Sequence, residues 1–211
     1  MEKKTENNRG LLLVVSGPSG AGKGTLCGLL RKALPNLAYS VSVTTREPRE
    51  GEVDGKDYFF KTVPEVKDMI FRGEFLEYAQ VYGNYYGTPK PYVMSLLGEG
   101  RDVLLEIDIQ GALQIKKVFP DAVLVFIIPP TLDELRARLY KRGKDTEEVI
   151  EKRLKESTRE LRIAAKYDYI IINDDIEKAC GHMLSLLDAE RYRSQRMDFV
   201  IDRMLDNASG K

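Results

Sequence analysis

The stretch LLLVVSGPSGAGKGT, residues 11–25, decides the fold of this chain. It opens with an apolar run that ends at Ser16, which is typical of a strand buried on both faces in a parallel sheet. A glycine-rich turn follows, and the next stretch, KGTLCGLLRKAL (residues 23–34), has the apolar spacing of a helix. A strand, a turn and a helix in this order predict the first unit of an α/β fold with a parallel sheet.

The turn matches the pattern G-x-x-x-x-G-K of a phosphate-binding loop. Its glycines allow backbone N–H groups to turn toward phosphate oxygens, and the helix N-terminus adds a partial positive charge. We expect Lys23 to reach the β- and γ-phosphate oxygens. An ordinary glycine-rich turn is the alternative, but the strand and the helix lie where the motif requires them. The candidate nucleotide-binding residues are Gly17, Pro18, Ser19, Gly20, Ala21, Gly22, Lys23, Gly24 and Thr25.

One position departs from the usual loop. Gly24 follows Lys23 at the place where Ser or Thr commonly binds Mg²⁺, and Thr25 comes one residue later. We therefore expect the Thr25 hydroxyl to act on phosphate, or on the metal through water.

A second candidate for the metal side is the segment LLEID, residues 104–108. Residues two apart in a strand share a face, so Glu106 and Asp108 are predicted to point the same way near the C-terminal end of a strand. Ligands bind at this end of parallel strands. Asp108 is expected to hold a hydrated Mg²⁺, and Glu106 to accept a hydrogen bond from a substrate. A pair of structural salt bridges is the alternative.

The rest of the chain repeats strands and helices. Strand-like runs lie at residues 38–43, 101–108, 122–128 and 168–173, and the last three precede helical patterns at 110–118, 132–141 and 176–193. A short helix is expected at residues 64–72, and residues 74–89 alternate and turn at GN like an antiparallel hairpin. These patterns predict a parallel sheet flanked by helices and interrupted by an inserted lobe at about residues 41–89.

Composition excludes several classes of partner. The 211 residues carry 33 Lys and Arg against 33 Asp and Glu, so no overall field attracts nucleic acid or an anionic membrane. Cys27 and Cys180 lack metal or redox spacing and are expected to be small core residues. There is one His, and no signal peptide or membrane-length apolar run is evident, so we expect a soluble, cytoplasmic protein. The oligomeric state is left open.

The segment SVSVTTREPREGEVDGKDYFF, residues 40–60, is too rich in hydroxyls, arginines and carboxylates for a spacer. With it, the sequence resembles the guanylate kinases, the P-loop nucleoside monophosphate kinases that use ATP to phosphorylate GMP. The resemblance covers about residues 11–189 and includes GPSGAGKGT, EFLEYAQVYGNYYGTP, LLEIDIQGA, IIPP with RLYKRG, and YDYIIIND. It implies one domain at 10–190, with a GMP-binding lobe at about 41–89 and a helical lid at about 138–155. Residues 191–211 are then a C-terminal helix and tail.

The resemblance also implies how the acceptor GMP is held. Arg46 and Arg49 are expected to grip its phosphate, helped by the hydroxyls of Tyr58 and Tyr86, because guanidinium groups match phosphate oxygens and phenols donate without adding charge. Glu52 is expected to orient the arginines or the bound nucleotide. The expected contacts to the nucleotide itself are Ser42, Glu77, Thr88 and Glu106.

Glu77 is the expected source of base selectivity. Guanine presents its N1–H and its N2 amino group side by side, and this pair of donors suits one carboxylate. Adenine has an acceptor at N1, which a carboxylate repels, so a site built on these hydrogen bonds should reject adenine strongly. A solvent-exposed strand carboxylate is the alternative for this residue.

The donor side is expected to be closed by a lid. Arg138 and Arg142 are four residues apart and share a helix face, and Arg153 lies on the following helix. The resemblance implies that they close over the donor phosphates; a solvated face paired with Glu147, Glu148 or Glu151 is the alternative. Asn173 matches the place where the family binds the adenine of ATP. The candidate catalytic residues are thus Lys23, Arg46, Arg138, Arg142 and Arg153.

Two other functions are open at this point. One is a monophosphate kinase with another base preference, against which Glu77 and the tyrosine-rich hairpin argue. The other is a non-catalytic binding module of the guanylate-kinase type. Such modules typically carry a degraded phosphate loop, whereas Lys23 and the glycines beside Ala21 are present here.

Overall fold

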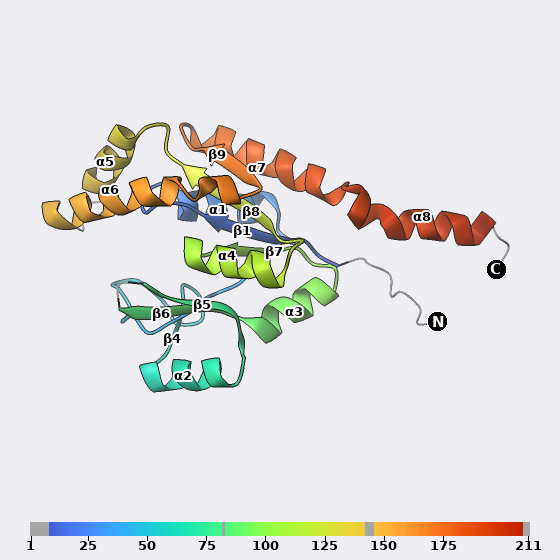
Figure 1. The fold of residues 1–211 in the computed structure, drawn as a ribbon, viewed down its shortest axis with the longest axis horizontal. Coiled ribbons are helices and arrows are strands. Elements are labelled where there is room, and N and C mark those ends of the chain that lie inside the picture. The colour runs from blue at the N-terminus through green and yellow to red at the C-terminus, as the bar shows by residue number, and fades with distance from the viewer. Residues whose placement is uncertain (1–8, 82, 142–145, 209–211) are drawn as a thin grey trace.

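The computed structural model describes residues 9–81, 83–141 and 146–208 of the chain. Helices and strands alternate along most of it (Figure 1). In chain order the elements are β1 (Leu12–Ser16), α1 (Lys23–Ala33), β2 (Ala38–Tyr39), β3 (Val43–Thr44), β4 (Phe59–Phe60), α2 (Val63–Phe71), β5 (Phe75–Val81), β6 (Asn84–Pro89), α3 (Lys90–Gly98), β7 (Val103–Glu106), α4 (Ile109–Val118), β8 (Val123–Ile128), α5 (Leu132–Lys141), α6 (Glu147–Leu161), the 3-10 turn η1 (Ala164–Lys166), β9 (Tyr169–Ile172), α7 (Ile176–Arg191) and α8 (Ser194–Ala208).

The core is a parallel sheet of five strands in the order β2-β7-β1-β8-β9. Strand β1 lies in the middle, with Leu13 opposite Leu104 of β7 and Val123 of β8. All five residues of β1 are buried, as expected of a strand that is covered on both faces. The predicted α/β class with a parallel sheet is confirmed.

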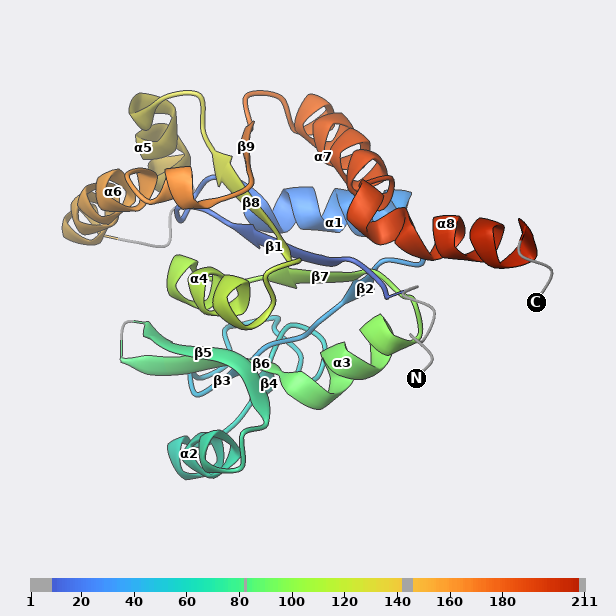
Figure 2. The same cartoon turned by 45° about the vertical axis from the view of Figure 1, so that its right-hand side comes forward.

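Helices cover both faces of this sheet (Figure 2). Alternate residues of β1 face opposite ways, and Leu13 packs in a core with residues of α1 and α7, including Leu26 and Met183. Leu12 packs on the other face with residues of α3 and α4, including Ile115. The two apolar layers hold β1 rigidly, so the loop that follows it starts from a fixed point.

A second sheet forms the inserted lobe, with strand order β4-β3-β6-β5. Strands β5 and β6 are antiparallel, which confirms the predicted hairpin. Along β5, Glu77 and Ala79 are buried while Tyr78 and Gln80 are exposed, so one side of the strand faces inward. Helix α2 lies below the strands of the lobe in Figure 1 and begins with a capping box between Thr62 and Glu65.

Helices α5 and α6 form a separate pair at the edge of the core. They pack through Leu135 and Leu139 of α5 and Ile150 and Leu154 of α6. Arg142, predicted to act in the lid, lies outside the described residues.

Two local predictions need correction, and one helix was not predicted. Residues 38–43 were predicted as one strand but form β2 of the core sheet and the start of β3 of the lobe. The chain changes sheets between Ser40 and Ser42. The N–H of Ser40 donates to the Leu104 carbonyl in the core, whereas the carbonyl of Ser42 accepts the N–H of Phe59 in the lobe. Helix α3 was not predicted, although its buried Val93, Leu96 and Leu97 have helical spacing. Strand β7 ends at Glu106, so Asp108 does not share a strand face with it.

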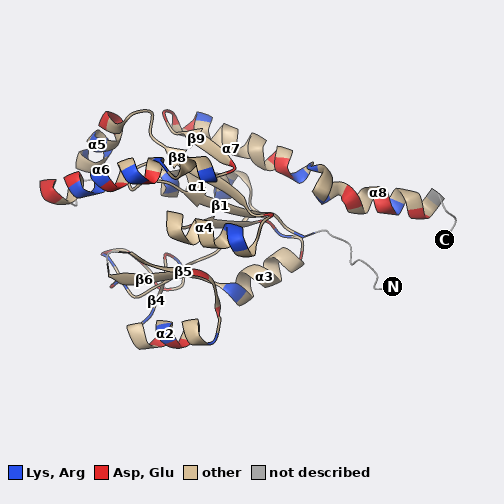
Figure 3. Ribbon diagram, viewed as in Figure 1, with Lys and Arg blue, Asp and Glu red and all other residues tan. Residues whose placement is uncertain are grey.

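Charges are intermixed on the helices rather than gathered by sign (Figure 3). Both signs occur along α6 and along α8, the arm that runs away from the sheet at the C-terminus. None of the described helices has the length and apolarity that crossing a bilayer requires.

Candidate functional site

The phosphate loop, residues 17–25, follows β1 and opens α1. Gly17, Gly20 and Gly22 have φ values of 142°, 90° and 93°, in the region that favours glycine. A Cβ on Gly17 would also come within 2.2 Å of the Ile127 carbonyl oxygen, so the close approach to β8 requires glycine there. The sequence motif therefore has the backbone path that it needs.

Lys23 lies over this loop. Its Nζ donates to the carbonyl oxygens of Gly17 at 2.5 Å and of Pro18 at 3.0 Å. The first turn of α1 has no acidic residue, while Arg31 and Lys32 lie in its last turn. The helix dipole and the lysine thus favour an anion at the same point, the N-terminus of α1.

Helices α5 and α6, the predicted lid, lie beside the loop. Arg153 of α6 donates to the Ser19 hydroxyl at 3.0 Å. Arg138 of α5 donates to the Asn173 carbonyl at 2.9 Å and pairs with Glu134 at 2.7 Å. Of the predicted clamp, these two arginines therefore lie beside the loop, and their role on phosphates stays a prediction.

Asn173 does not lie open to solvent at the end of β9. It is 4% exposed, and its side-chain amide donates to the carbonyl of Ala21 at 2.8 Å. The predicted contact with adenine remains untested, but the amide nitrogen is already bonded to the phosphate loop.

Asp108 and Glu106, the predicted residues near Mg²⁺, do not share a strand face as predicted. Asp108 is the N-cap of α4, and its Oδ1 accepts the N–H groups of Gln110 and Gly111 at 2.7 and 3.2 Å. Glu106 lies against the loop instead: a Cβ on Gly24 would be 3.6 Å from its Oε1. Among the described residues, no group of three or more Asp, Glu, His or Cys side chains gathers as a metal site.

Glu106 stands between the two halves of the site. Burial raises its pKa, while the charge of Lys23 and the thiol of Cys27, a buried core residue as predicted, oppose that rise. Burial also raises the pKa of Tyr58 in the lobe, and the charges of Tyr86 and Glu106 add to that rise. One carboxylate therefore acts electrostatically on both the donor and the acceptor side.

Arg46 and Glu52 form the centre of the predicted phosphate grip. One guanidinium nitrogen of Arg46 lies 2.9 Å from both oxygens of Glu52, and the N–H of Arg49 donates to Glu52 at 2.7 Å. Burial alone would raise the pKa of Glu52, but these two arginines outweigh it and leave the pKa lowered. Glu52 therefore stays charged and holds both residues in place.

Aromatic rings frame this grip. The Arg46 guanidinium carbon lies 5.4 Å from the ring centre of Tyr58 and 5.9 Å from that of Phe60. The rings of Tyr58 and Tyr86 are 6.0 Å apart, edge to face. Burial would lower the pKa of Arg46, but Glu52 and Tyr86 outweigh it and raise the pKa. The side chains of Arg46, Tyr58, Tyr86 and Glu52 are thus brought together, with the backbone N–H of Arg49 beside them.

Glu77 is buried, only 4% exposed, and the Thr88 hydroxyl donates to its Oε1 at 2.6 Å. Burial raises the pKa of Glu77 to about 7; the charge of Asp108 adds to the rise and the Thr88 hydrogen bonds oppose it. The alternative of a solvent-exposed strand carboxylate is wrong. Ser42, half-buried next to β3, belongs to the same lobe, and its contact with a base stays a prediction.

Two residues near the site were not predicted. A Cβ on Gly111 of α4 would lie 2.3 Å from Glu77 Oε2, so this glycine makes room for the carboxylate. The motif LLEIDIQGA contains Gly111 and could have pointed to it. Burial raises the pKa of Glu160 on α6, and the charge of Lys23 opposes that rise. No sequence signal marks that residue.

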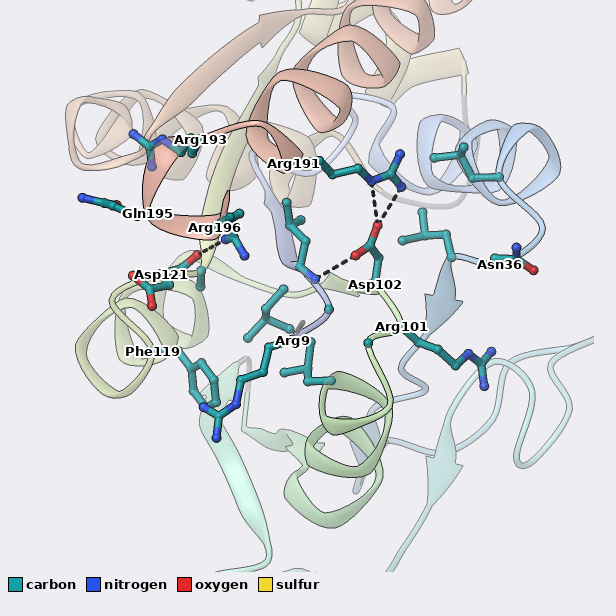
Figure 4. A pocket seen from close by; sticks show the side chains of 18 of the residues that line it. Arg9, Asn36, Arg101, Asp102, Phe119, Asp121, Arg191, Arg193, Gln195 and Arg196 are labelled. Atoms are coloured by element: carbon teal, nitrogen blue, oxygen red, sulfur yellow. Dashed lines mark hydrogen bonds and ion pairs between the residues drawn. The ribbon is translucent and has the colours of Figure 1, made fainter. Parts of the chain in front are cut away.

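A cavity of about 830 Å³ lies at the opposite end of the core sheet (Figure 4). Its central carboxylate, Asp102, is already bonded by the N–H of Leu11 at 2.8 Å and by Arg191 at 2.7 Å. Arg9 and Arg101 point away from each other in Figure 4. Because these cations do not converge, we assign the substrates to the other end of the sheet.

Comparison with known proteins finds matches over most of the chain. The family model described as Guanylate kinase matches residues 9–190. A guanylate kinase of Desulfitobacterium hafniense (strain Y51) is 51% identical over 92% of this chain and 98% of that protein. A guanylate kinase of Lactococcus lactis subsp. lactis (strain IL1403) is 52% identical over 92% of this chain and 94% of that protein. The crystal structure of guanylate kinase from Anaplasma phagocytophilum superposes with a TM-score of 0.77 at 34% identity, covering 93% and 96% of the two chains.

Proposed function

This chain belongs to the guanylate kinase family and is an ATP:GMP phosphotransferase, and from that premise we propose which residues carry out the transfer. The core at residues 10–190 binds ATP at the phosphate loop, the lobe at about 41–89 binds GMP, and the lid at about 138–155 closes over ATP. The C-terminal part, residues 191–211, lies outside this unit, and its described portion includes α8.

The observation that best supports GMP as the acceptor is the buried pair of Glu77 and Thr88. A carboxylate buried without a cation is costly unless a ligand donates to it. The N1–H and N2 amino group of guanine supply two such donors, whereas adenine brings an acceptor to the same point. Ser42, Thr88 and Glu106 complete the proposed contacts with the nucleotide.

On the donor side, the loop N–H groups and Lys23 hold the ATP phosphates. Phosphoryl transfer requires two polyanions in line and stabilisation of charge on the transferring oxygens, with little covalent help from the protein. Lys23, Arg138, Arg142 and Arg153 supply positive charge for this purpose. Lys23 now bonds the Gly17 and Pro18 carbonyls, and it exchanges these contacts for phosphate oxygens.

On the acceptor side, Arg46 and Arg49 bind the GMP phosphate with Tyr58 and Tyr86. Glu52 holds the Arg46 guanidinium and the Arg49 backbone before the nucleotide arrives, so Arg46 loses less side-chain freedom on binding. The acceptor oxygen is thereby restrained for attack on the γ-phosphorus.

Mg²⁺ fits this site as an ion that arrives with ATP. Gly24 offers no hydroxyl, and the Asp108 Oδ1 already accepts two N–H groups in capping α4. Thr25 and Asp108 would hold it through water. The ion supplies charge neutralisation at the β- and γ-phosphates.

Closure of the lobe and the lid excludes water and so prevents ATP hydrolysis. Small-angle scattering should therefore give a smaller radius of gyration with both nucleotides than without them. The same profile in both states would count against closure. The substrates ATP and GMP are small molecules, and we place the reaction in the cytoplasm, where both occur with Mg²⁺.

The test of this function is a panel of nucleoside monophosphates offered with ATP and Mg²⁺ in a coupled assay for ADP. We expect GMP to be the preferred acceptor. A preference for AMP, CMP or UMP would assign a different monophosphate kinase, and no turnover with any of them would favour a binding module.

A further inference from the structure

Asn173 joins three parts of the donor side. Its backbone N–H donates to the Ile128 carbonyl of β8 at 2.8 Å. Its carbonyl accepts Arg138 of α5, and its side-chain amide donates to the Ala21 carbonyl in the phosphate loop. One buried residue thus links the edge of the core sheet, a lid helix and the loop.

The bond to Ala21 fixes the direction of one peptide. Ala21 is fully buried, so its carbonyl has no access to water and depends on the amide of Asn173. In a planar trans peptide, the C=O and the following N–H point in opposite directions. A carbonyl held toward Asn173 therefore turns the N–H of Gly22 to the other side of the loop.

The Asn173 side-chain amide also lies close to the backbone of Gly22. A Cβ on Gly22 would lie 2.3 Å from the Asn173 side-chain nitrogen. Gly22 has a φ of 93° and is the N-cap of α1, where an anion meets the helix dipole. The glycine that the loop motif requires is thus needed here for the close approach of Asn173 as well as for the backbone turn.

We propose that Asn173 is a positioning residue for the donor phosphates. It fixes the Ala21–Gly22 peptide so that the Gly22 N–H faces the phosphate, and it acts through the loop rather than on the adenine ring. This inference rests on the proposed role of the loop in binding ATP. If Asn173 acts in this way, its loss weakens binding of the ATP phosphates, whereas loss of a base contact would weaken binding of adenine.

The experiment separates phosphate from base. Inorganic tripolyphosphate and adenosine are each titrated as competitors of ATP against the wild type, Asn173→Ala and Asn173→Asp. The Asp side chain has nearly the same shape but places an acceptor against the Ala21 carbonyl. We expect tripolyphosphate to bind both variants about tenfold more weakly or worse, as for loss of a buried hydrogen bond, while adenosine binding is unchanged.

Asn36→Asp is the matched control because it makes the same change at an exposed site on the α1–β2 loop. It should leave both inhibition constants as they are. Weaker adenosine binding with unchanged tripolyphosphate binding in the Asn173 variants would overturn the proposal. If tripolyphosphate failed to compete even in the wild type, the proposed role of the loop would be wrong instead.

A measurement on the wild type covers the case in which a variant does not fold. The side-chain amide of Asn173 is followed by NMR during titration with each competitor. We expect its resonances, protected by the bond to Ala21, to stay fixed with adenosine and to shift with tripolyphosphate. A shift with adenosine alone would show a base contact and contradict the inference.

Discussion

The donor and acceptor sides of this chain are built from different groups. The phosphate loop is a backbone site, in which three glycines with positive φ and the start of α1 form the surface. The acceptor lobe is a side-chain site, where Arg46 pairs with Glu52 and Glu77 with Thr88. A backbone site depends on the path of the chain, and a side-chain site on charge and protonation. Substitutions on the two sides should therefore change different kinetic parameters.

Two carboxylates within the lobe also differ from each other. Burial raises the pKa of both Glu52 and Glu77 when it acts alone. At Glu52 the arginines reverse that effect, whereas at Glu77 no cation among the described residues opposes it and the pKa rises to about 7. The lobe thus keeps Glu52 charged to arrange its cations, while Glu77 is expected to titrate near pH 7.

The largest expected effect is on the donor side. Lys23→Ala should lower kcat by about 10²–10³-fold, because it removes a charge that stabilises the transferring phosphoryl group. KM for GMP should change little, since the acceptor lobe is separate. Steady-state kinetics with both substrates varied measure this.

Lys32→Ala is the control for that variant, because it removes a lysine from the exposed last turn of the same helix. It should keep full activity. Normal turnover in Lys23→Ala would refute the donor-side mechanism.

The next effect is confined to the acceptor side. Arg46→Lys should raise KM for GMP by about tenfold or more and leave KM for ATP nearly unchanged, because an ammonium group cannot bind phosphate through a planar fork. Arg72→Lys makes the same change in the lobe at an exposed residue paired with Asp68 and Glu74, and it should be neutral. An equal rise in KM for both substrates would show that the two sides are not separate.

The smallest effect concerns pH. GMP donates to Glu77 and therefore binds the ionised carboxylate, whose pKa in the free protein is about 7. The charged fraction of Glu77 falls from about one half at pH 7 to about one tenth at pH 6, so KM for GMP should rise by about fivefold over this range. Above pH 8 this dependence should vanish.

Glu77→Gln separates this effect from titration of the GMP phosphate, which both proteins share. The variant should lose the part of the pH dependence due to Glu77 and bind GMP more weakly throughout. If both proteins gave parallel pH profiles of KM for GMP, Glu77 would not be the titrating group.

Local sequence patterns predicted much of the fold and part of the candidate site. The run before Ser16, the glycines of the loop and the spacing of α5 predicted their elements because each depends on neighbours in the chain. The switch of sheets between Ser40 and Ser42 depends on partners distant in sequence, so the alternation of residues 38–43 could not predict it.

The same distinction applies to the site. The motifs placed Glu77 and Arg46 in one lobe, but the burial of Glu77 depends on Thr88 and on the missing side chain of Gly111. Asp108 was misplaced because an N-cap and a strand residue look alike in sequence. The bond from Asn173 to Ala21 joins residues 152 positions apart, and no local pattern indicates it.

The most direct test of acceptor recognition is the ratio of kcat/KM for GMP to that for AMP, compared between the wild type and Glu77→Ala. Glu74→Ala, in the same lobe, is the control. A site built on hydrogen bonds should favour GMP by about 10⁴-fold in the wild type, and the variant should lose most of that ratio while the control retains it. An undiminished preference for GMP in Glu77→Ala would show that another group selects the base.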